Sequence, residues 1–378
     1  MDLVRYTVDL EARYLAFVLK GPGCEVVRVE LGTAAALDDT ASAWHEVLRD
    51  PSALPERVRH RGLALSGLLL DPLLEEVGDR KHWLIVPDGP LATIPIGALP
   101  TGDGYAIEHY LMTYLDRAND LLRPRSPSGE GAVVIGDVDY DASRSTEGAP
   151  RSFLAPCNGG DFGALPGTAA ETEQIAGRWT RFRRSESIST LGGESATESA
   201  VASALEGKAL AHIATHGFFA TGDCRSALAD GIGYDPMVLS GLVLAGANRS
   251  ADARSPEDGI LTAGEVATLD LSGTDLVVLS ACETGLGEIQ SGQGVLGLRR
   301  GFAIAGARTL VMSLWAVPDE ETTALMDAFY RRHLRRRGMP AAQALRAAQL
   351  ERLAKQRSEG AEHPFEWAAF IASGGSGL

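Results

Sequence analysis

The sequence predicts an α/β fold whose mostly parallel sheet is covered by helices on both faces. Two observations lead to this prediction. From about residue 130, short apolar segments alternate with helical patterns, as expected for consecutive strand–helix units. The apolar segments are also nearly continuous, which is typical of parallel strands that are buried on both faces. Residues 1–125 follow another pattern and are predicted to form an N-terminal mixed α/β half, ahead of a second half at 126–378.

The N-terminal half combines an antiparallel start with helices and further strands. Residues 4–30 alternate apolar and polar side chains and contain the turn signal GPG, which predicts an antiparallel pair or meander. Helical patterns and apolar strands are expected next at about 35–49, 63–77, 82–89 and 109–115.

The second half opens with the strand AVVIGDVDY at 132–140. Later strands are predicted at LAHIAT, GLVLAG, LVVLSA and TLVMSLW. Capping-box spacings predict that helices open at Thr168-x-x-Glu171 and at Ser195-x-x-Glu198. Three later helices are expected at about 294–305, 319–336 and 340–356. The stretches 141–163 and 219–258 are predicted to be long loops, the first because it is rich in Ser, Gly and Pro.

The composition narrows the class of protein. An apolar fraction of 45% with 22% charged residues is that of a soluble globular protein. The formal charge of −15 argues against nucleic acid or an anionic membrane as a direct partner. A run of arginines lies late in a predicted helix, where it suits the helix dipole: Arg331, Arg332, Arg335, Arg336 and Arg337.

The cysteines and the N-terminus indicate the compartment. The four cysteines are dispersed without a CxxC pair, at Cys24, Cys157, Cys224 and Cys282. This spacing fits neither a zinc site nor a disulfide scaffold, so we expect a reducing compartment, no metal and no cofactor. The chain begins with acidic residues instead of a signal peptide, and it has no long apolar stretch. We therefore expect a cytoplasmic protein.

Two chemically active residues follow predicted strands. His216 comes directly after LAHIAT, and Cys282 comes directly after LVVLSA. Parallel strands direct their carboxyl ends to one edge, so the imidazole and the thiol are expected to meet there. An adjacent imidazole favours the reactive thiolate, and the N–H groups of Gly217 and Cys282 are expected to bind a developing oxyanion.

Each residue also has a structural interpretation. A lone cysteine after an apolar strand is usually an inert buried residue, and a histidine at a strand end is usually held by structural hydrogen bonds. Two further patterns are rejected. The GxGxxG match at 292–297 lies about ten residues beyond its strand, too far for a dinucleotide turn. His212 and His216 have the spacing of a zinc helix but lack its central glutamate.

A longer set of motifs resembles a known family. HIATHGFF followed by LVVLSACETGLGEIQSGQGVLGLRRGFAIAGARTLVMSLWAV resembles the CHAT domain, a caspase-like family of clan CD cysteine peptidases related to separase. The upstream segments WLIVPDGPLATIPIGAL, LPGTAAETE and SGLVLAGA resemble it as well. The resemblance implies a caspase-like α/β/α sandwich with a catalytic dyad of His216 and Cys282. It also implies that residues 1–125 are a non-catalytic, pseudo-caspase-like half.

The resemblance extends to specificity and partners. Acidic pocket residues favour a basic P1 side chain in several members, and Asp137, Asp139 and Asp319 follow strands at the expected edge. Trp315 is expected to wall the cleft, while a helix N-cap is the alternative for Asp319. The family implies a regulated endopeptidase of bacterial signalling or defence, with a protein substrate that a neighbouring gene can encode. Its regulator is expected to be a sensor protein or repeat domain, which this chain does not contain, so it is either free-standing or an excised domain.

A second class of function remains open at this point. The chain can instead be a caspase-like scaffold whose dyad is silent and which binds partner proteins. Labelling of Cys282 by a cysteine-directed peptide probe, if it requires His216, distinguishes an enzyme from such a scaffold.

Overall fold

The fold is given by a computed structural model of the chain. It describes all residues except 9–10, 22, 24, 103, 125, 143–161, 220–236, 250–256, 281–287, 291–293, 336–337 and 376–378. The described residues form two compact units: residues 1–123, 289–295 and 342–378 make the first, and residues 124–288 and 296–341 make the second. The sequence-based division at residue 125 stays a prediction.

The first unit begins with a three-stranded antiparallel sheet, which confirms the predicted meander. Its strands are β1 (Asp2–Val8), β2 (Glu11–Leu19) and β3 (Val26–Thr33), in the order β1-β2-β3. The helix α1 (Ala34–Leu48) follows β3 directly and buries Leu37, Ala41, Trp44 and Leu48, which recur at helical spacing. The Thr33 hydroxyl caps this helix by accepting a hydrogen bond from the Ala36 N–H.

The helix predicted at 63–77 is longer and interrupted. It begins earlier, as α2 (Pro55–Leu65), passes through one π-helical turn at 66–70, and continues as α3 (Asp71–Val77). Pro55 occupies the first turn of α2, where no backbone N–H is required. The remaining elements of this unit are β4 (His82–Ile85), β5 (Pro100–Thr101), β6 (Gly104–Tyr105), α4 (Ala106–His109), β7 (Leu111–Tyr114), β15 (Glu288–Gln290), β16 (Gly294–Leu296), α12 (Ala341–Ser358) and β18 (Phe370–Ser373).

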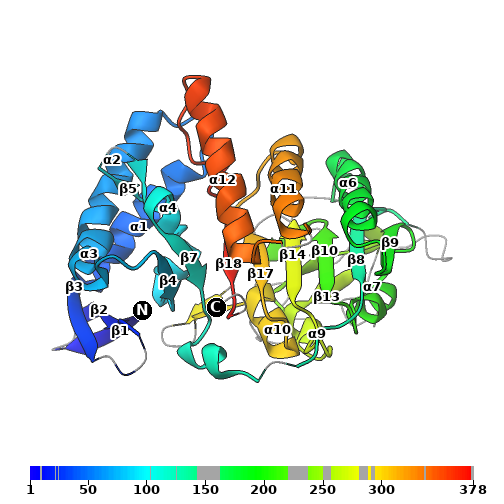
Figure 1. Ribbon diagram of the computed structural model, residues 1–378, viewed down its shortest axis with the longest axis horizontal. Coiled ribbons are helices and arrows are strands. Elements are labelled where there is room, and N and C mark those ends of the chain that lie inside the picture. The colour runs from blue at the N-terminus through cyan, green and yellow to red at the C-terminus, as the bar shows by residue number, and fades with distance from the viewer. Residues whose placement is uncertain are drawn as a thin grey trace. The chain divides into compact units, whose positions relative to one another are not determined.

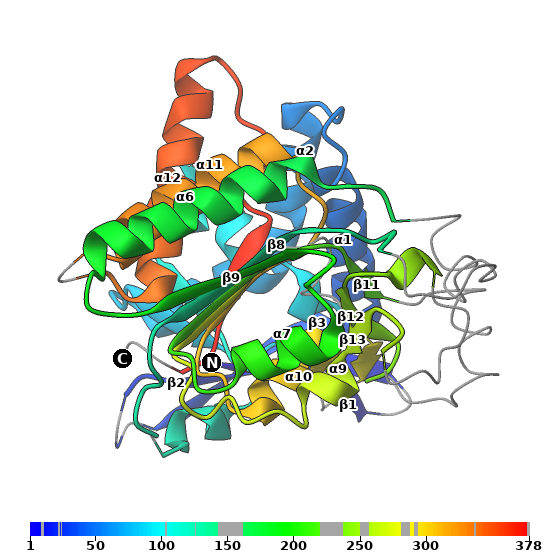
Figure 2. The ribbon, with the colours of Figure 1, turned by 90° about the vertical axis from the view of Figure 1, so that its right-hand side faces the viewer.

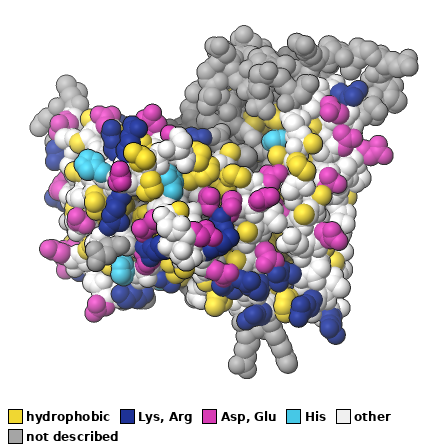
Figure 3. All heavy atoms as spheres, turned by 90° about the horizontal axis from the view of Figure 1, so that it is seen from above, with side chains coloured by type: hydrophobic (Ala, Val, Ile, Leu, Met, Phe, Trp, Pro, Cys, Tyr) yellow, Lys and Arg dark blue, Asp and Glu magenta, His cyan; other side chains and the backbone are white. Residues whose placement is uncertain are grey.

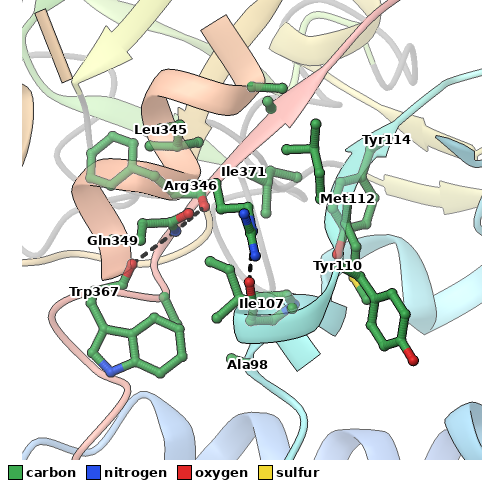
Figure 4. A pocket seen from close by; sticks show the side chains of 17 residues that line it. Ala98, Ile107, Tyr110, Met112, Tyr114, Leu345, Arg346, Gln349, Trp367 and Ile371 are labelled. Atoms are coloured by element: carbon green, nitrogen blue, oxygen red, sulfur yellow. Dashed lines mark hydrogen bonds between the residues drawn. The ribbon is translucent and has the colours of Figure 1, made fainter. Parts of the chain in front are cut away.

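Strands β4, β7 and β18 pair in parallel, and α12 packs beside them. Two polar side chains fasten α12 to this unit (Figure 4). Gln349 donates to the carbonyls of Trp367 and Phe370, and Arg346 donates to those of Ile107 and Glu108. Between these contacts lies an open pocket that is lined mainly by apolar side chains. Because both polar side chains are engaged by the backbone, we assign this pocket a structural role.

The second unit is built on five parallel strands. In chain order they are β8 (Ala132–Val138), β9 (Ile188–Gly193), β10 (Leu210–Ala214), β14 (Leu276–Ser280) and β17 (Leu310–Ser313). Their spatial order is β9-β8-β10-β14-β17, and every described pairing among them is parallel. All residues of β10 and β14 are buried, as expected for strands covered on both faces. The predicted α/β class with mostly parallel strands is thus confirmed.

Helices cover both faces of these strands (Figure 2). One face carries α6 (Pro166–Phe182) and α11 (Asp319–His333). The other carries α7 (Glu198–Leu205), α9 (Ala263–Val266) and α10 (Leu298–Ala305). A smaller antiparallel sheet joins this unit, with the order β11 (Gly217–Phe219), β12 (Ser240–Val243) and β13 (Ile260–Thr262).

The distribution of charged side chains on the surface indicates which kinds of partner the protein can bind. Acidic and basic side chains are interspersed with apolar ones on the face seen in Figure 3. Of the predicted arginine run, Arg331 lies 4.0 Å from Asp327, and Arg332 donates to the carbonyl of Ala328 on the same helix. Both arginines are thus engaged at the end of α11. Among the described helices, none combines the length and apolarity needed to cross a membrane.

Candidate active site

The strand order predicts where a crevice lies in the second unit. After β8 the chain first adds β9 on one side, then crosses back to place β10 on the other side. Helices leave neighbouring strands in opposite directions at such a switch point, which leaves a crevice beyond their carboxyl ends. Asp139 and His216 follow β8 and β10, whereas Asp137, which was also predicted to follow its strand, lies near the end of β8 itself. The crevice at this switch point is therefore the candidate active site.

The strands that carry the predicted dyad are neighbours. Strand β10 pairs with β14 in parallel, and Ala214 lies opposite Ser280. His216 comes two residues after Ala214, and Cys282 comes two residues after Ser280. Cys282 itself lies outside the described residues, so the distance between its sulfur and the imidazole stays a prediction. The register nevertheless assigns the two residues equivalent positions beyond adjacent strands.

The His216 imidazole is held by an acceptor and two rings. Its Nε2 lies 2.7 Å from the carbonyl oxygen of Gly163. Its ring centroid is 5.0 Å from that of Tyr140 and 5.5 Å from that of Phe162, with tilted rings on both contacts. A carbonyl oxygen can only accept, so Nε2 carries a proton and Nδ1 is the acceptor in the neutral imidazole.

Buried polar groups fix the Tyr140 ring. The Tyr140 hydroxyl lies 3.0 Å from the hydroxyl of Thr215, which in turn donates to the carbonyl of Val243. Tyr140 is 3% exposed and Thr215 is fully buried, so this short network is shielded from water. Val243 also donates its N–H to the His216 carbonyl, and Gly217 lies opposite Leu242. The smaller antiparallel sheet therefore begins at the histidine.

Sequence reasoning missed Asn248, which joins three segments around the crevice. Its side-chain oxygen accepts from the Phe162 N–H at 2.7 Å, and its Nδ2 donates to the Phe162 carbonyl at 3.0 Å. The same Nδ2 lies 3.2 Å from a carboxylate oxygen of Asp141, and the Asn248 N–H donates to Tyr140. An asparagine in a loop gives no signal of such contacts, because its partners are distant in sequence.

Asp137 stands out among the predicted substrate-binding residues. It is exposed, and among the described non-glycine residues it is the one with a positive φ, 54°. The pairing of β8 with β9 shifts at this point, and the Asp137 N–H donates to the Thr168 hydroxyl. Its carboxylate makes no hydrogen bond or ion pair with other described residues. Left-handed backbone costs energy for a residue with a Cβ, and such strain is concentrated at functional sites.

The other three predicted residues are already engaged. The Asp139 carboxylate accepts from the Asp141 N–H in a local turn, and the Asp319 carboxylate accepts from the Gly167 N–H. Asp319 is thus not the N-cap of its own helix, where that position is Pro318, but caps the start of α6 instead. Trp315 is 1% exposed. Its role in walling the cleft stays a prediction.

A second histidine, His212, lies within strand β10. His212 is fully buried, and its Nδ1 lies 3.1 Å from the Tyr330 hydroxyl. Its Nε2 lies 3.1 Å from Oε1 of Glu171, within ion-pair distance although the groups are not aligned for a hydrogen bond. Burial, and then the nearby Glu171 carboxylate, raise the pKa of Tyr330 well above its usual value.

Both predicted capping boxes are wrong: α6 begins at Pro166 instead of Thr168, and Thr197 instead of Ser195 caps α7.

Comparison with protein families then decides the family. A family model described as the CHAT domain matches residues 59–375. The chain belongs to the CHAT domain family. In the part of this CHAT domain that the structure describes, no group of three or more His, Cys, Asp or Glu side chains is arranged to hold a metal ion. The four cysteines are not in that part.

Curated proteins share a shorter region with this CHAT domain. It is 33% identical over 124 residues to tetratricopeptide repeat protein 28 of Homo sapiens, covering 33% of this chain and 5% of that protein. The mouse protein of the same name is 34% identical over 115 residues, covering 30% of this chain and 4% of that protein. The chain thus spans a small fraction of the length of these relatives.

Solved structures also resemble this CHAT domain. A separase–securin complex of Saccharomyces cerevisiae matches 94% of this chain and 21% of that chain, with a TM-score of 0.46 and 10% identity. The Arg-specific cysteine proteinase gingipain R matches 91% of this chain and 75% of that chain, with a TM-score of 0.46 and 11% identity. A likeness of this degree carries no argument about activity.

Proposed function

We propose that this CHAT domain is a cysteine endopeptidase that cleaves a specific protein substrate with a dyad of His216 and Cys282. The observation that carries the proposal is the register of β10 and β14, in which Ala214 lies opposite Ser280. Both dyad residues come two positions after this pair, beyond the carboxyl ends of adjacent strands. Catalytic groups gather at this edge of open parallel sheets.

The orientation of the histidine suits the chemistry. Because Nε2 donates to the Gly163 carbonyl, Nδ1 is left to exchange a proton with the Cys282 thiol. No described atom forms a hydrogen bond with Nδ1 of His216.

The proposed reaction is two acyl transfers. The Cys282 thiolate attacks the scissile carbonyl carbon, and the carbonyl electron pair moves onto oxygen, where the N–H groups of Gly217 and Cys282 stabilise it. The tetrahedral intermediate collapses as the C–N bond breaks, and the protonated His216 delivers its proton to the departing amine. Water, deprotonated by His216, then attacks the thioester, so that the acid product leaves and the thiol is restored.

Substrate choice is proposed to depend on the switch-point crevice. Of the three acidic candidates, Asp137 has a carboxylate without a described partner, whereas the carboxylates of Asp139 and Asp319 accept backbone hydrogen bonds. Asp137 is therefore the favoured group for pairing with a basic P1 side chain. The positive φ of Asp137 fixes the direction of its Cα–Cβ bond at the end of β8.

We also propose a regulated role in a bacterial signalling or defence pathway of the cytoplasm. The regulator would be a repeat-containing sensor, and the name of the curated relatives, tetratricopeptide repeat protein 28, supports this class. The substrate would be a protein, with a product of a neighbouring gene as the first candidate.

The test combines labelling with substrate discovery. A cysteine-directed peptide probe should label the wild type at Cys282 and should label neither Cys282→Ala nor His216→Ala. Proteome-wide mapping of new N-termini, with wild type against Cys282→Ala, should reveal a small set of cleavage sites. Binding of partner proteins without any labelling or new N-termini, in the presence of the partner, would instead establish the silent scaffold.

A further inference from the structure

We infer that Asn248 is a positioning residue, which sets the tautomer and the orientation of His216 through the peptide that joins Phe162 to Gly163. This inference rests on the proposed function, because the orientation of the His216 imidazole matters only if it exchanges a proton with Cys282. It depends on a chain of three contacts: Asn248 to the Phe162 backbone, Phe162 to Gly163, and the Gly163 carbonyl to His216.

The first contact is a two-point clamp. The Asn248 side chain accepts from the Phe162 N–H and donates to the Phe162 carbonyl. One amide group thereby fixes both polar groups of one residue, as a neighbouring strand would. Asn248 is 6% exposed, and its own N–H is bonded to Tyr140, so the clamp is shielded and anchored. Hydrogen bonds in such a shielded place strongly favour one geometry.

Packing does not hold the carbonyl that follows. A Cβ added to Gly163 would have no described atom within 4 Å, so no described side chain packs against that side of the residue. Glycine also has more backbone freedom than any other residue. The position of Gly163 is therefore set by its neighbours in the chain, and the clamped residue Phe162 is directly before it.

The same clamp places a ring against the imidazole. Phe162 is 5% exposed, and its ring lies 5.5 Å from that of His216. Loss of Asn248 would release the acceptor of Nε2 and one of the two flanking rings together. The imidazole would then be free to turn and to exchange its proton between nitrogens.

The tautomer can be measured without a substrate. Protein labelled with ¹⁵N-histidine is studied by two-bond ¹H–¹⁵N correlation at a pH where His216 is neutral, and His216→Gln assigns its signals. The wild type should show the Nε2–H tautomer. In Asn248→Ala the Nδ1–H tautomer should become comparably populated, and labelling of Cys282 should slow about ten- to a hundredfold, as for other small displacements of catalytic groups.

Two further variants complete the design. Asn248→Asp keeps the acceptor for Phe162 but loses the donor and faces the Asp141 carboxylate, so its tautomer should shift in the same direction. Gln349→Ala is the matched control: Gln349 is also an amide that is 6% exposed and donates to two backbone carbonyls, but it lies in the first unit. It should lower the melting temperature and leave the His216 tautomer unchanged.

The outcomes separate this inference from the proposed function. A wild type in the Nδ1–H form, or a folded Asn248 variant with the wild-type tautomer and labelling rate, would overturn the positioning role. A tautomer that shifts in the Asn248 variants, in a protein whose Cys282 is never labelled, would support the positioning role and overturn the peptidase.

Discussion

The Glu171 carboxylate lies 3.1 Å from Nε2 of His212, and both side chains are shut off from solvent. His212→Leu would leave this carboxylate buried without its nearest partner. Leaving a buried polar group without its partner costs about 1–3 kcal/mol, so the free energy of unfolding should fall by that amount. Urea denaturation measures it.

The control for this prediction is on the same helix. Glu173 is exposed on α6, and Glu173→Leu should change stability by less than about 0.5 kcal/mol. The double variant Glu171→Leu/His212→Leu should be more stable than His212→Leu alone, since no carboxylate is left unpaired. Additive losses in the double variant would contradict the pairing.

Glu198 predicts a dependence of stability on pH. Its side chain is 5% exposed and accepts the Gly259 N–H at 2.6 Å. Burial is the main cause that raises the pKa of Glu198 to about 8; the Gly259 N–H opposes the rise, and Asp258 and Glu265 add to it. The native state thus keeps the proton up to about pH 8, whereas the unfolded chain loses it above its ordinary pKa of 4.5.

Between these two values the native state binds more protons, so stability should fall as the pH rises, by at most about 1.4 kcal/mol per pH unit. Glu198→Gln should remove this contribution and melt at a higher temperature than the wild type at pH 8, with little difference near pH 4.5. The exposed Glu194→Gln is the control. Parallel melting curves for wild type and Glu198→Gln across this range would refute the assignment.

The dyad predicts non-additive losses. Cys282→Ala and His216→Ala should each abolish cleavage of the true substrate and leave the melting temperature within a few degrees of the wild type. When two residues act together in one step, removing either one abolishes that step, and removing the second costs nothing more. The double variant should therefore be no slower than either single variant. Activity that persists in Cys282→Ala would rule out the proposed nucleophile.

Because of the Asp137 carboxylate, we expect the enzyme to prefer a basic P1 residue. Asp137 is exposed, so the bound substrate must shield its pair with an Arg or Lys side chain; such a shielded pair is worth roughly 1.5–3 kcal/mol, which is about a ten- to hundredfold preference. Asp137→Ala should lose this preference in a P1-scanning fluorogenic library, while Asp139→Ala should keep it. A wild type that prefers an apolar or acidic P1 would exclude the pocket assignment.

Helices α6 and α11 approach closely at Gly167 but not at Gly177, so a Gly→Ala substitution should have opposite effects on stability at these two positions. A Cβ at Gly167 would lie 2.4 Å from Cβ of Asp319, so Gly167→Ala should destabilise the fold by about 1–3 kcal/mol. A Cβ at Gly177, in the same helix, would meet no described atom within 4 Å. Gly177→Ala should therefore stabilise by about 0.5–1 kcal/mol. Thermal melts of both variants check the pair.

The strands and the edge that carries the candidate site were predictable from the sequence. Apolar runs such as LAHIA and LVVLS identify buried parallel strands because burial on both faces leaves no room for polar alternation. The residues directly after such strands then belong to one edge. By this reasoning His216 was expected directly after its strand, and it does follow β10, whereas Asp137 was expected after β8 and lies inside it.

Contacts made across the chain were not predictable. Thr168 and Glu171 have the spacing of a capping box, but their side chains bond to the Asp137 N–H and lie beside His212. The sequence contains local spacing and not these distant partners. The same limit hid Asn248, whose partner Phe162 is 86 residues away. Strand β9 was missed because it is only partly buried and so lacks a continuous apolar run, and β18 was missed as well.

The acceptor for His216 is a main-chain oxygen, and this affects how such a site can diverge. A change of side chain at position 163 leaves the carbonyl in place, and a Cβ there would meet no described atom within 4 Å. An inserted or deleted residue between Phe162 and the start of α6 would instead move the carbonyl by more than the length of a hydrogen bond. Relatives should therefore vary freely in the identity of this residue and hardly at all in its spacing from α6.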